Sequence, residues 1–197
     1  MSSENLNTRE RILRATWEML DSNPGVAARM SDIAKKANVS RQALYLHFPN
    51  RTELFIATTK YQDEVFNVDN MLATSRAASS GQQRLDAFVE AWGSYIPKIY
   101  GVAKTLMLMQ ATDVEAAAAW DTRMRDMREG CEAAVFALSR DGQLSNTYTE
   151  KQATDVLWSL LSISTWETLT IASHWSQDAY LARIKQITKT LLVAQSE

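Results

Sequence analysis

The sequence predicts an all-α protein, with a small helical domain at the N-terminus and a larger helical domain after it. Its 197 residues include only six Gly and three Pro, and 46 % of them are apolar. So few turn-forming residues in a chain of this length favour long helices over many short strands. Apolar residues also recur at helical spacing, as expected for helices with one buried face. We place the N-terminal domain at residues 1–52 and the C-terminal domain at residues 53–197.

The first predicted helix runs from Thr8 to about Leu20. Ile12 and Leu13 belong to its apolar face. The segment Asp21–Gly25, which contains Pro and Gly, ends the helix. The N-terminal domain therefore begins with a helix that has one side to bury.

The segment 31–48 predicts two short helices joined by a tight turn. Ser31 and Ser40 each stand where a side-chain oxygen can cap the start of a helix. Asn38 falls in the turn, which needs a left-handed residue, and Asn adopts that conformation more readily than most residues. Val39 is the expected buried pivot. The pattern is that of a helix-turn-helix, whose second helix enters the major groove of DNA.

The remaining predicted helices follow Pro49. Asn50 can cap a helix from Arg51 to about Asn67. Ser79–Gly81 is the expected hinge between the two domains. Five further helices are expected at residues 82–99, 102–110, 113–140, 149–173 and 178–195.

The motif resembles the DNA-binding segment of the TetR family of bacterial transcriptional regulators. The matching residues are Ile33, Ala34, Ala37, Val39, Ser40, Leu44, Tyr45, His47, Phe48 and Leu54. Three positions depart from the family pattern: Asn38 replaces a Gly, Arg51 replaces a Lys, and Gln42 stands where Gly is common. The resemblance implies a helix-turn-helix DNA-binding domain followed by a ligand-binding and dimerisation domain, with about nine helices in all.

Side chains on the open side of the second motif helix are the candidates for DNA contact. Arg41 can donate to a guanine edge and Gln42 can pair with an adenine. Tyr45 and His47 are better placed for phosphate oxygens. The complete predicted set is Ser31, Ser40, Arg41, Gln42, Ala43, Tyr45, His47, Arg51 and Thr52. Arg51 and Thr52 form a second phosphate contact at the start of the next helix.

The distribution of charge agrees with a DNA-binding N-terminus. Residues 1–60 contain nine Lys or Arg against six Asp or Glu, a net charge of +3. The remaining residues contain twelve against seventeen, a net charge of −5. A mildly basic domain joined to an acidic one suits a sequence-specific DNA-binding protein better than a protein that coats DNA.

Aromatic and Met side chains in the C-terminal domain predict a pocket for an apolar or aromatic small molecule. With one nearby hydroxyl, the predicted ligand-binding residues are Trp92, Tyr95, Met107, Met124, Ser162 and Trp166. The alternative is that these side chains fill the core or a dimer contact.

The last two predicted helices are apolar over an arc wider than one core needs. We therefore expect a twofold homodimer. The predicted dimer residues are Val156, Leu160, Tyr180, Ile184, Ile187 and Leu191.

Other classes of protein are disfavoured. The single Cys131 precludes an internal disulfide and suits the cytoplasm, where it is either a reactive sensor or a buried small residue. The polar N-terminus predicts no signal peptide, and apolar runs are too short for a membrane helix. No zinc-ligand spacing, phosphate loop or nucleophile motif is present, so we expect no metal, no cofactor and no enzyme.

Together these features predict a repressor that binds a palindromic operator and leaves it when a small apolar or aromatic ligand binds. Two alternatives stay open. The regulator could be constitutive or respond to a protein partner, or the chain could be a helical interaction module without DNA binding.

Overall fold

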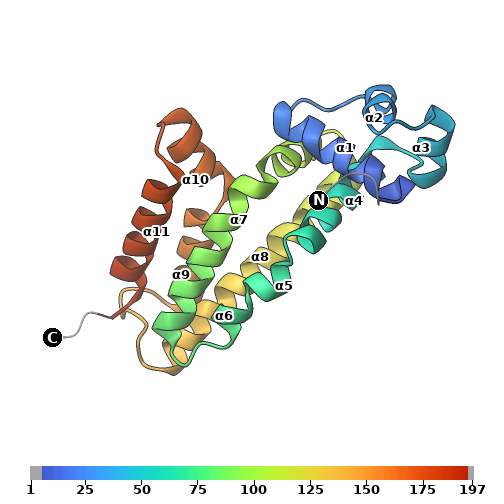
Figure 1. Cartoon of the computed structure of the whole chain (residues 1–197). Helices are drawn as coiled ribbons and strands as arrows, with labels where there is room; N and C mark the ends of the chain where they lie inside the picture. Colours follow the sequence, from blue (N-terminus) through green and yellow to red (C-terminus); the bar gives the residue numbers. More distant parts are fainter. Residues whose placement is uncertain (1–5, 195–197) are drawn as a thin grey trace. The chain divides into compact units, whose positions relative to one another are not determined.

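The computed structural model describes residues 6–194, and within them the chain is helical (Figure 1). The elements are α1 (Thr8–Ser22), α2 (Met30–Lys36), α3 (Arg41–His47), α4 (Arg51–Val65), α5 (Val68–Met71), α6 (Ala73–Arg76), α7 (Gly81–Met109), α8 (Val114–Arg140), α9 (Glu150–Leu160), α10 (Ile163–Glu167), the π-helix η2 (Thr168–Ala172) and α11 (Gln177–Leu192). The described residues contain no strand beyond one isolated bridge, between Leu144 and Val193. The all-α prediction is confirmed. None of the described helices is both long and apolar enough to cross a bilayer.

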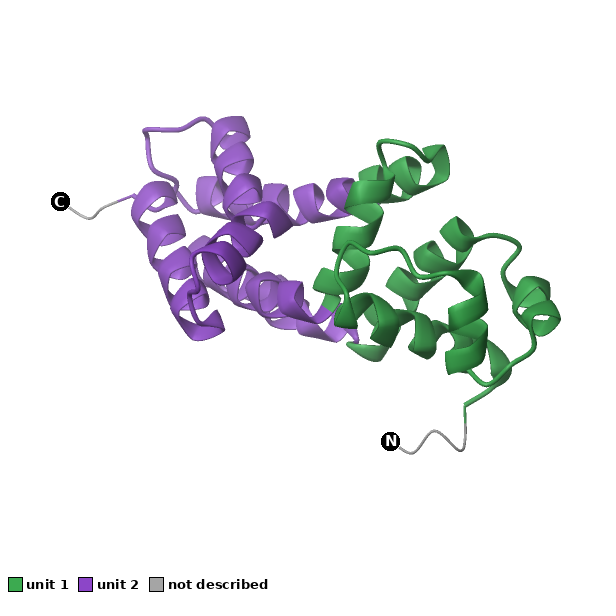
Figure 2. Ribbon diagram, turned by 90° about the horizontal axis from the view of Figure 1, so that it is seen from above, with its two compact units in different colours: residues 1–66, 99–122 green, residues 67–98, 123–197 purple. Residues whose placement is uncertain are grey.

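The chain divides into two compact units, coloured separately in Figure 2. Unit 1 consists of residues 1–66 and 99–122, and unit 2 of residues 67–98 and 123–197. All of α4 belongs to unit 1, where it packs along α1. The predicted boundary after residue 52 separates a DNA-binding part from a ligand-binding and dimerisation part, and it stays a prediction.

Unit 1 is built around α1 and α4. The Asn7 side chain accepts from the Glu10 backbone N–H at 2.9 Å, and the Glu10 carboxylate accepts from the Asn7 N–H at 3.0 Å. This reciprocal pair satisfies two donors that a helix start leaves unpaired. Apolar side chains of both helices are fully buried, including Ile12 and Leu13 from α1 and Phe55 from α4. The base that carries the motif helices is therefore well packed.

The long helix α7 replaces two predicted helices. The break expected between residues 99 and 102 is wrong, since one helix of 29 residues continues through Pro97. Proline has no backbone N–H, so the carbonyl of Gly93, four residues earlier, loses its helical donor. The Gln177 side chain from α11 donates to that carbonyl at 3.0 Å. A tertiary hydrogen bond thus replaces the one that proline removes.

The helix predicted over residues 149–173 is also wrong, because the chain breaks after α9. Ser162 caps α10, and its hydroxyl oxygen accepts from the Thr165 N–H at 3.1 Å. Serine side chains compete for backbone groups in this way and favour helix starts over helix interiors. After α10 the backbone widens into η2.

The hinge predicted at Ser79–Gly81 is wrong as well, since these residues lie inside unit 2. The Gly81 N–H donates to the Asp141 carboxylate at 2.7 Å. A Cβ atom at Gly81 would lie 2.5 Å from the carbonyl oxygen of Ala137 in α8. Gly81 is therefore a point of close contact between α7 and α8, where only glycine fits.

Candidate nucleic-acid interface

The turn between α2 and α3 has the predicted conformation. Asn38 has a φ of +53°, in the left-handed region. The Val39 N–H donates to the Ala34 carbonyl at 3.0 Å and closes the turn. The Ser40 hydroxyl caps α3 by accepting from the Ala43 N–H at 3.0 Å. Local side-chain chemistry therefore fixes where α3 begins.

Helix α3 has one buried side and one exposed side. Leu44 and, just after the helix, Phe48 are buried in unit 1. The exposed residues of the helix are Arg41, Gln42, Tyr45, Leu46 and His47. Ala43 is half-buried, at the edge between the two sides. The helix thus presents a mostly polar face to solvent, as the sequence predicted.

A shallow depression of about 510 Å³ lies beside this face. Three arginines line it, Arg29, Arg41 and Arg51, together with Tyr45 and Asn50. Guanidinium groups bind phosphate oxygens in a bidentate manner, and tyrosine hydroxyls add hydrogen bonds. The depression therefore has the chemistry of a phosphate site, and Arg29 is a member that sequence analysis missed. Its position directly before α2 was the available indication.

The predicted role of Ser31 as a helix cap is wrong. Helix α2 begins two residues earlier than a Ser31 cap implies, and Arg29 is its N-cap residue without a side-chain cap bond. The Ser31 hydroxyl instead donates to the Asp32 carboxylate at 3.5 Å. Ser31 still lines the depression, so its DNA contact stays a prediction.

The predicted phosphate contact of Thr52 is contradicted by its burial. The residue is 6 % exposed, and its hydroxyl donates to the carboxylate of Asp113, which caps α8 within unit 1. This hydrogen bond, followed by one from the Ala116 N–H, holds the pKa of Asp113 below its ordinary value. Thr52 therefore fastens α4 to the start of α8, and the neighbouring Arg51 stays exposed.

Leu46 is the second residue that sequence analysis missed. It is 80 % exposed, in the last turn of a helix whose neighbours on that side are polar. The spacing indicated this, because Leu44 and Phe48 point inward and a residue midway between them falls on the opposite side of a helix. The exposed face of α3 is therefore not purely polar.

Comparison with known proteins agrees with this geometry. The family model described as "Bacterial regulatory proteins, tetR family" matches residues 12–58, which span α1 to α4. The HTH-type transcriptional activator FasR of Mycolicibacterium smegmatis is 32 % identical over 142 residues, covering 69 % of this chain and 61 % of FasR. The chain belongs to the TetR family.

Other relatives match about a third of this TetR-family chain. The nucleoid occlusion factors SlmA of Marinobacter nauticus and Vibrio cholerae are 36 % and 41 % identical over 64 residues. These matches cover 32 % of this chain, and the chain spans about a third of the length of these curated relatives.

Solved structures show the same fold at low sequence identity. A transcriptional regulator from Saccharomonospora viridis, in complex with choline, superposes with a TM-score of 0.81 at 15 % identity, covering 95 % of this chain and 98 % of that one. FadR from Bacillus subtilis, in complex with stearoyl-CoA, gives a TM-score of 0.73 at 15 % identity, with 91 % and 96 % covered. The TetR-like architecture therefore extends over nearly the whole chain.

Most of the predicted ligand-binding residues of this TetR-family chain have structural partners in unit 2. The Trp92 indole N–H donates to the Leu161 carbonyl at 3.0 Å, and its ring lies edge-on to Tyr95, which is fully buried. The Trp166 indole N–H donates to the Gln177 carboxamide oxygen at 2.8 Å. Ser162 caps α10. Met107 belongs to unit 1 and Met124 to unit 2, each partly exposed. A ligand role for these six residues stays a prediction.

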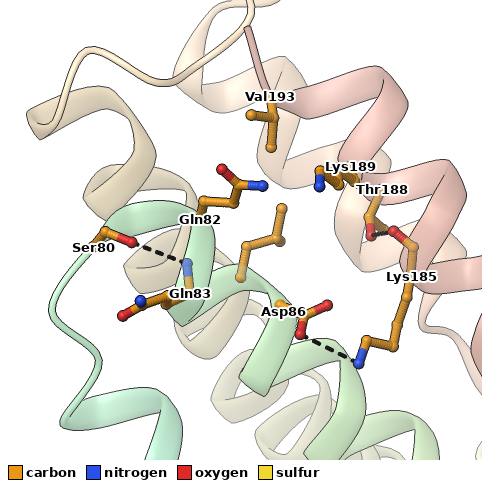
Figure 3. A pocket seen from close by; sticks show the side chains of 9 residues that line it. Ser80, Gln82, Gln83, Asp86, Lys185, Thr188, Lys189 and Val193 are labelled. Atoms are coloured by element: carbon orange, nitrogen blue, oxygen red, sulfur yellow. Dashed lines mark hydrogen bonds and ion pairs between the residues drawn. The ribbon is translucent and has the colours of Figure 1, made fainter. Parts of the chain in front are cut away.

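Unit 2 also contains a pocket of about 340 Å³, between the start of α7 and the end of α11 (Figure 3). None of the six predicted ligand residues lines it. Most of its lining residues are of polar type, with Gln82 and Gln83 on one side and Lys185 on the other. The Lys185 ammonium lies 3.2 Å from the Asp86 carboxylate and 3.0 Å from that of Glu90. The charge of this lysine is therefore balanced by two carboxylates, of which that of Asp86 lines the pocket.

The predicted dimer residues fall into two groups. Tyr180 and Ile184 are buried within a single chain, at 0 % and 1 % exposure, so they have no side-chain surface left to bury against a second copy. That part of the prediction is wrong, because this stripe of α11 faces the core of unit 2. Four residues are partly exposed and stay candidates: Val156, Leu160, Ile187 and Leu191.

Of the two alternatives for Cys131, a reactive sensor or a buried small residue, the structure favours the second. Cys131 is fully buried in α8, and burial raises the pKa of its thiol despite the nearby Arg128. A thiol that stays protonated is a poor nucleophile. Within residues 6–194, no group of three or more His, Cys, Asp or Glu is arranged to hold a metal ion.

Proposed function

We propose that this chain is a DNA-binding transcriptional regulator, which acts by binding and not by catalysis. One observation carries the proposal. The exposed face of α3 lies beside a depression lined by three arginines, in the segment that matches the TetR-family DNA-binding domain. An anionic duplex is the partner that complements such a surface.

The side chains divide into two roles. Arg29, Arg51 and Tyr45 bind phosphate oxygens and set the orientation of α3 in the major groove. Arg41 and Gln42 contact base edges, where a bidentate pair discriminates between bases by about 1–3 kcal/mol. Sequence preference should therefore depend on Gln42 and overall affinity on Tyr45.

The regulator acts as a twofold homodimer on a palindromic operator. The partly exposed apolar residues of α9 and α11, Val156, Leu160, Ile187 and Leu191, support this arrangement. A twofold axis gives two α3 helices whose separation must match about one turn of DNA or a multiple of it.

A small molecule that binds the C-terminal domain releases the repressor from its operator. Support comes from the two solved relatives of the same fold, which hold choline and stearoyl-CoA. These ligands differ greatly, so they do not identify the effector of this chain. FasR is named an activator, so the sign of regulation needs its own test. Expression of a reporter gene placed behind the selected operator distinguishes a repressor from an activator.

The test begins with a duplex that the full chain selects from a random-sequence pool. Affinity should fall steeply with salt, because each neutralised phosphate releases counterions. Tyr45→Ala should weaken binding to every duplex, whereas Tyr148→Ala in unit 2 should not. Gln42→Ala should change the selected sequence. Duplex binding that does not depend on salt or on Tyr45 would refute the proposal. The absence of any duplex binding would refute it too and favour an interaction module, and operator binding that no small molecule alters would favour a protein partner.

A further inference from the structure

We propose that Leu46 contacts the C5-methyl group of a thymine in the operator and so determines part of its sequence. This inference rests on the proposed DNA-binding function. It adds a specificity-determining residue of a different chemical kind, since the other exposed side chains of α3 are polar or carry a polar tip.

The position of Leu46 is the first argument. At 80 % exposure, it is the most exposed large apolar side chain of α3. In the same helix, Leu44 is fully buried and packs in the core of unit 1, whereas Leu46 lies outside that core. Exposed leucines are common singly, but this one stands on the face that the proposed function turns to DNA.

The chemistry of the major groove is the second argument. Guanine, adenine and cytosine present only hydrogen-bond donors and acceptors there, whereas thymine adds a methyl group. An apolar side chain gains nothing from phosphates or from polar base edges that it desolvates. The partner that suits Leu46 in this groove is therefore the thymine methyl.

The third argument is the short length of the helix. Seven residues give α3 a length of about 10 Å, and the major groove is about 12 Å wide. The last turn of α3 therefore lies in the groove together with the first.

Spacing then narrows the choice of base pair. Gln42 and Leu46 are four residues apart and share one side of the helix. One helical turn rises about 5.4 Å and one base pair about 3.4 Å. The thymine that Leu46 contacts should lie one or two base pairs from the adenine that Gln42 contacts.

Deoxyuridine, which is thymine without the methyl group, tests this directly. In the selected operator, each thymine is replaced in turn by deoxyuridine in both half-sites, and affinity is measured at one salt concentration by fluorescence anisotropy. For the wild-type chain, one position should lose about fourfold in affinity per half-site, the value of one buried methyl group.

The variant Leu46→Ala should lose a similar factor on the thymine operator and no longer respond to deoxyuridine at that position. Val26→Ala is the matched control, because Val26 is a 64 % exposed apolar residue outside α3. It should keep both the affinity and the response of the wild type.

Two results would overturn the inference while leaving the proposed function intact. One is an unchanged affinity of Leu46→Ala, which would point to a protein contact or to no contact. The other is that, at every thymine position, deoxyuridine lowers the affinity of Leu46→Ala by the same factor as that of the wild type. The side chain and the methyl group would then act independently. A chain that binds no duplex at all would overturn both proposals together.

Discussion

In unit 1, α3 turns the side chains of Arg41 and Gln42 to solvent, and neither has a hydrogen-bond partner among residues 6–194. In unit 2, by contrast, the indole N–H groups of Trp92 and Trp166 donate to groups of the same chain. Both sets stood out in the sequence as contact residues. The difference teaches that unused hydrogen-bonding capacity separates a contact surface from a polar network that holds the fold together.

The largest expected effect on stability distinguishes the buried side of α3 from its exposed side. Leu44→Ala removes a fully buried side chain and should lower the free energy of unfolding by about 3 kcal/mol. Leu46→Ala, two residues away, should change it by less than about 0.5 kcal/mol. Urea denaturation measures both. Equal losses would mean that α3 has no exposed face.

The polar network of unit 2 offers the corresponding test. Gln177→Ala leaves the Gly93 carbonyl and the Trp166 indole N–H without their partner, and should cost about 2–3 kcal/mol. The exposed Gln186→Ala, on the same helix, is the control. A Gln177→Ala chain as stable as the control would show that these two hydrogen bonds do not stabilise the fold.

Close packing of α7 on α8 predicts a somewhat smaller loss. Gly81→Ala places a Cβ atom 2.5 Å from the Ala137 carbonyl oxygen and should destabilise the fold by about 2 kcal/mol. Gly142→Asn is the comparison, because Gly142 has a φ of +65° and nothing within 4 Å of an added Cβ. Asparagine tolerates that conformation. If thermal denaturation found the two variants alike, the segment before α7 would be a hinge as first expected.

Features fixed by neighbouring residues were predictable from the sequence. The left-handed Asn38, the Ser40 cap and the inward Leu44 follow from chemistry within a few residues, and the structure has all three. Features that depend on distant residues were not. Thr52 is buried because Asp113 accepts a hydrogen bond from its hydroxyl, and α7 continues past Pro97 because Gln177 supplies a donor.

The same distinction applies to the candidate site. Helical spacing placed Arg41, Gln42, Tyr45 and His47 outside, and they are exposed. Arg29 was missed because it joins them only through the folded turn.

A smaller effect on stability is expected at Thr52, which is buried, unlike the exposed Arg51 beside it. Thr52→Val removes the hydroxyl that donates to Asp113 and should cost about 1 kcal/mol at neutral pH. The lowered pKa of Asp113 stabilises the fold above the unfolded pKa, and this contribution is lost as the pH falls through the folded value. Below about pH 4, the stability of the wild type should therefore fall more steeply than that of the variant. Parallel pH profiles would contradict the role of this bond.

Cys131 should give no response in the folded state. A thiol-reactive dye should leave it unmodified in the native protein and modify it fully in guanidinium chloride, because the thiol is buried and burial raises its pKa. If the native chain were modified at the rate of a free thiol, Cys131 would be accessible and the sensor interpretation would be favoured.

The proline inside α7 ties together two positions that lie 80 residues apart. Where a homologue has a residue with an N–H at position 97, the carbonyl at position 93 recovers its own helical donor, and position 177 keeps only its bond with the Trp166 indole. We expect the two positions to covary across a family alignment. An ancestor that acquired the proline first would have been a strained intermediate, so glutamine at 177 should be the older of the two changes.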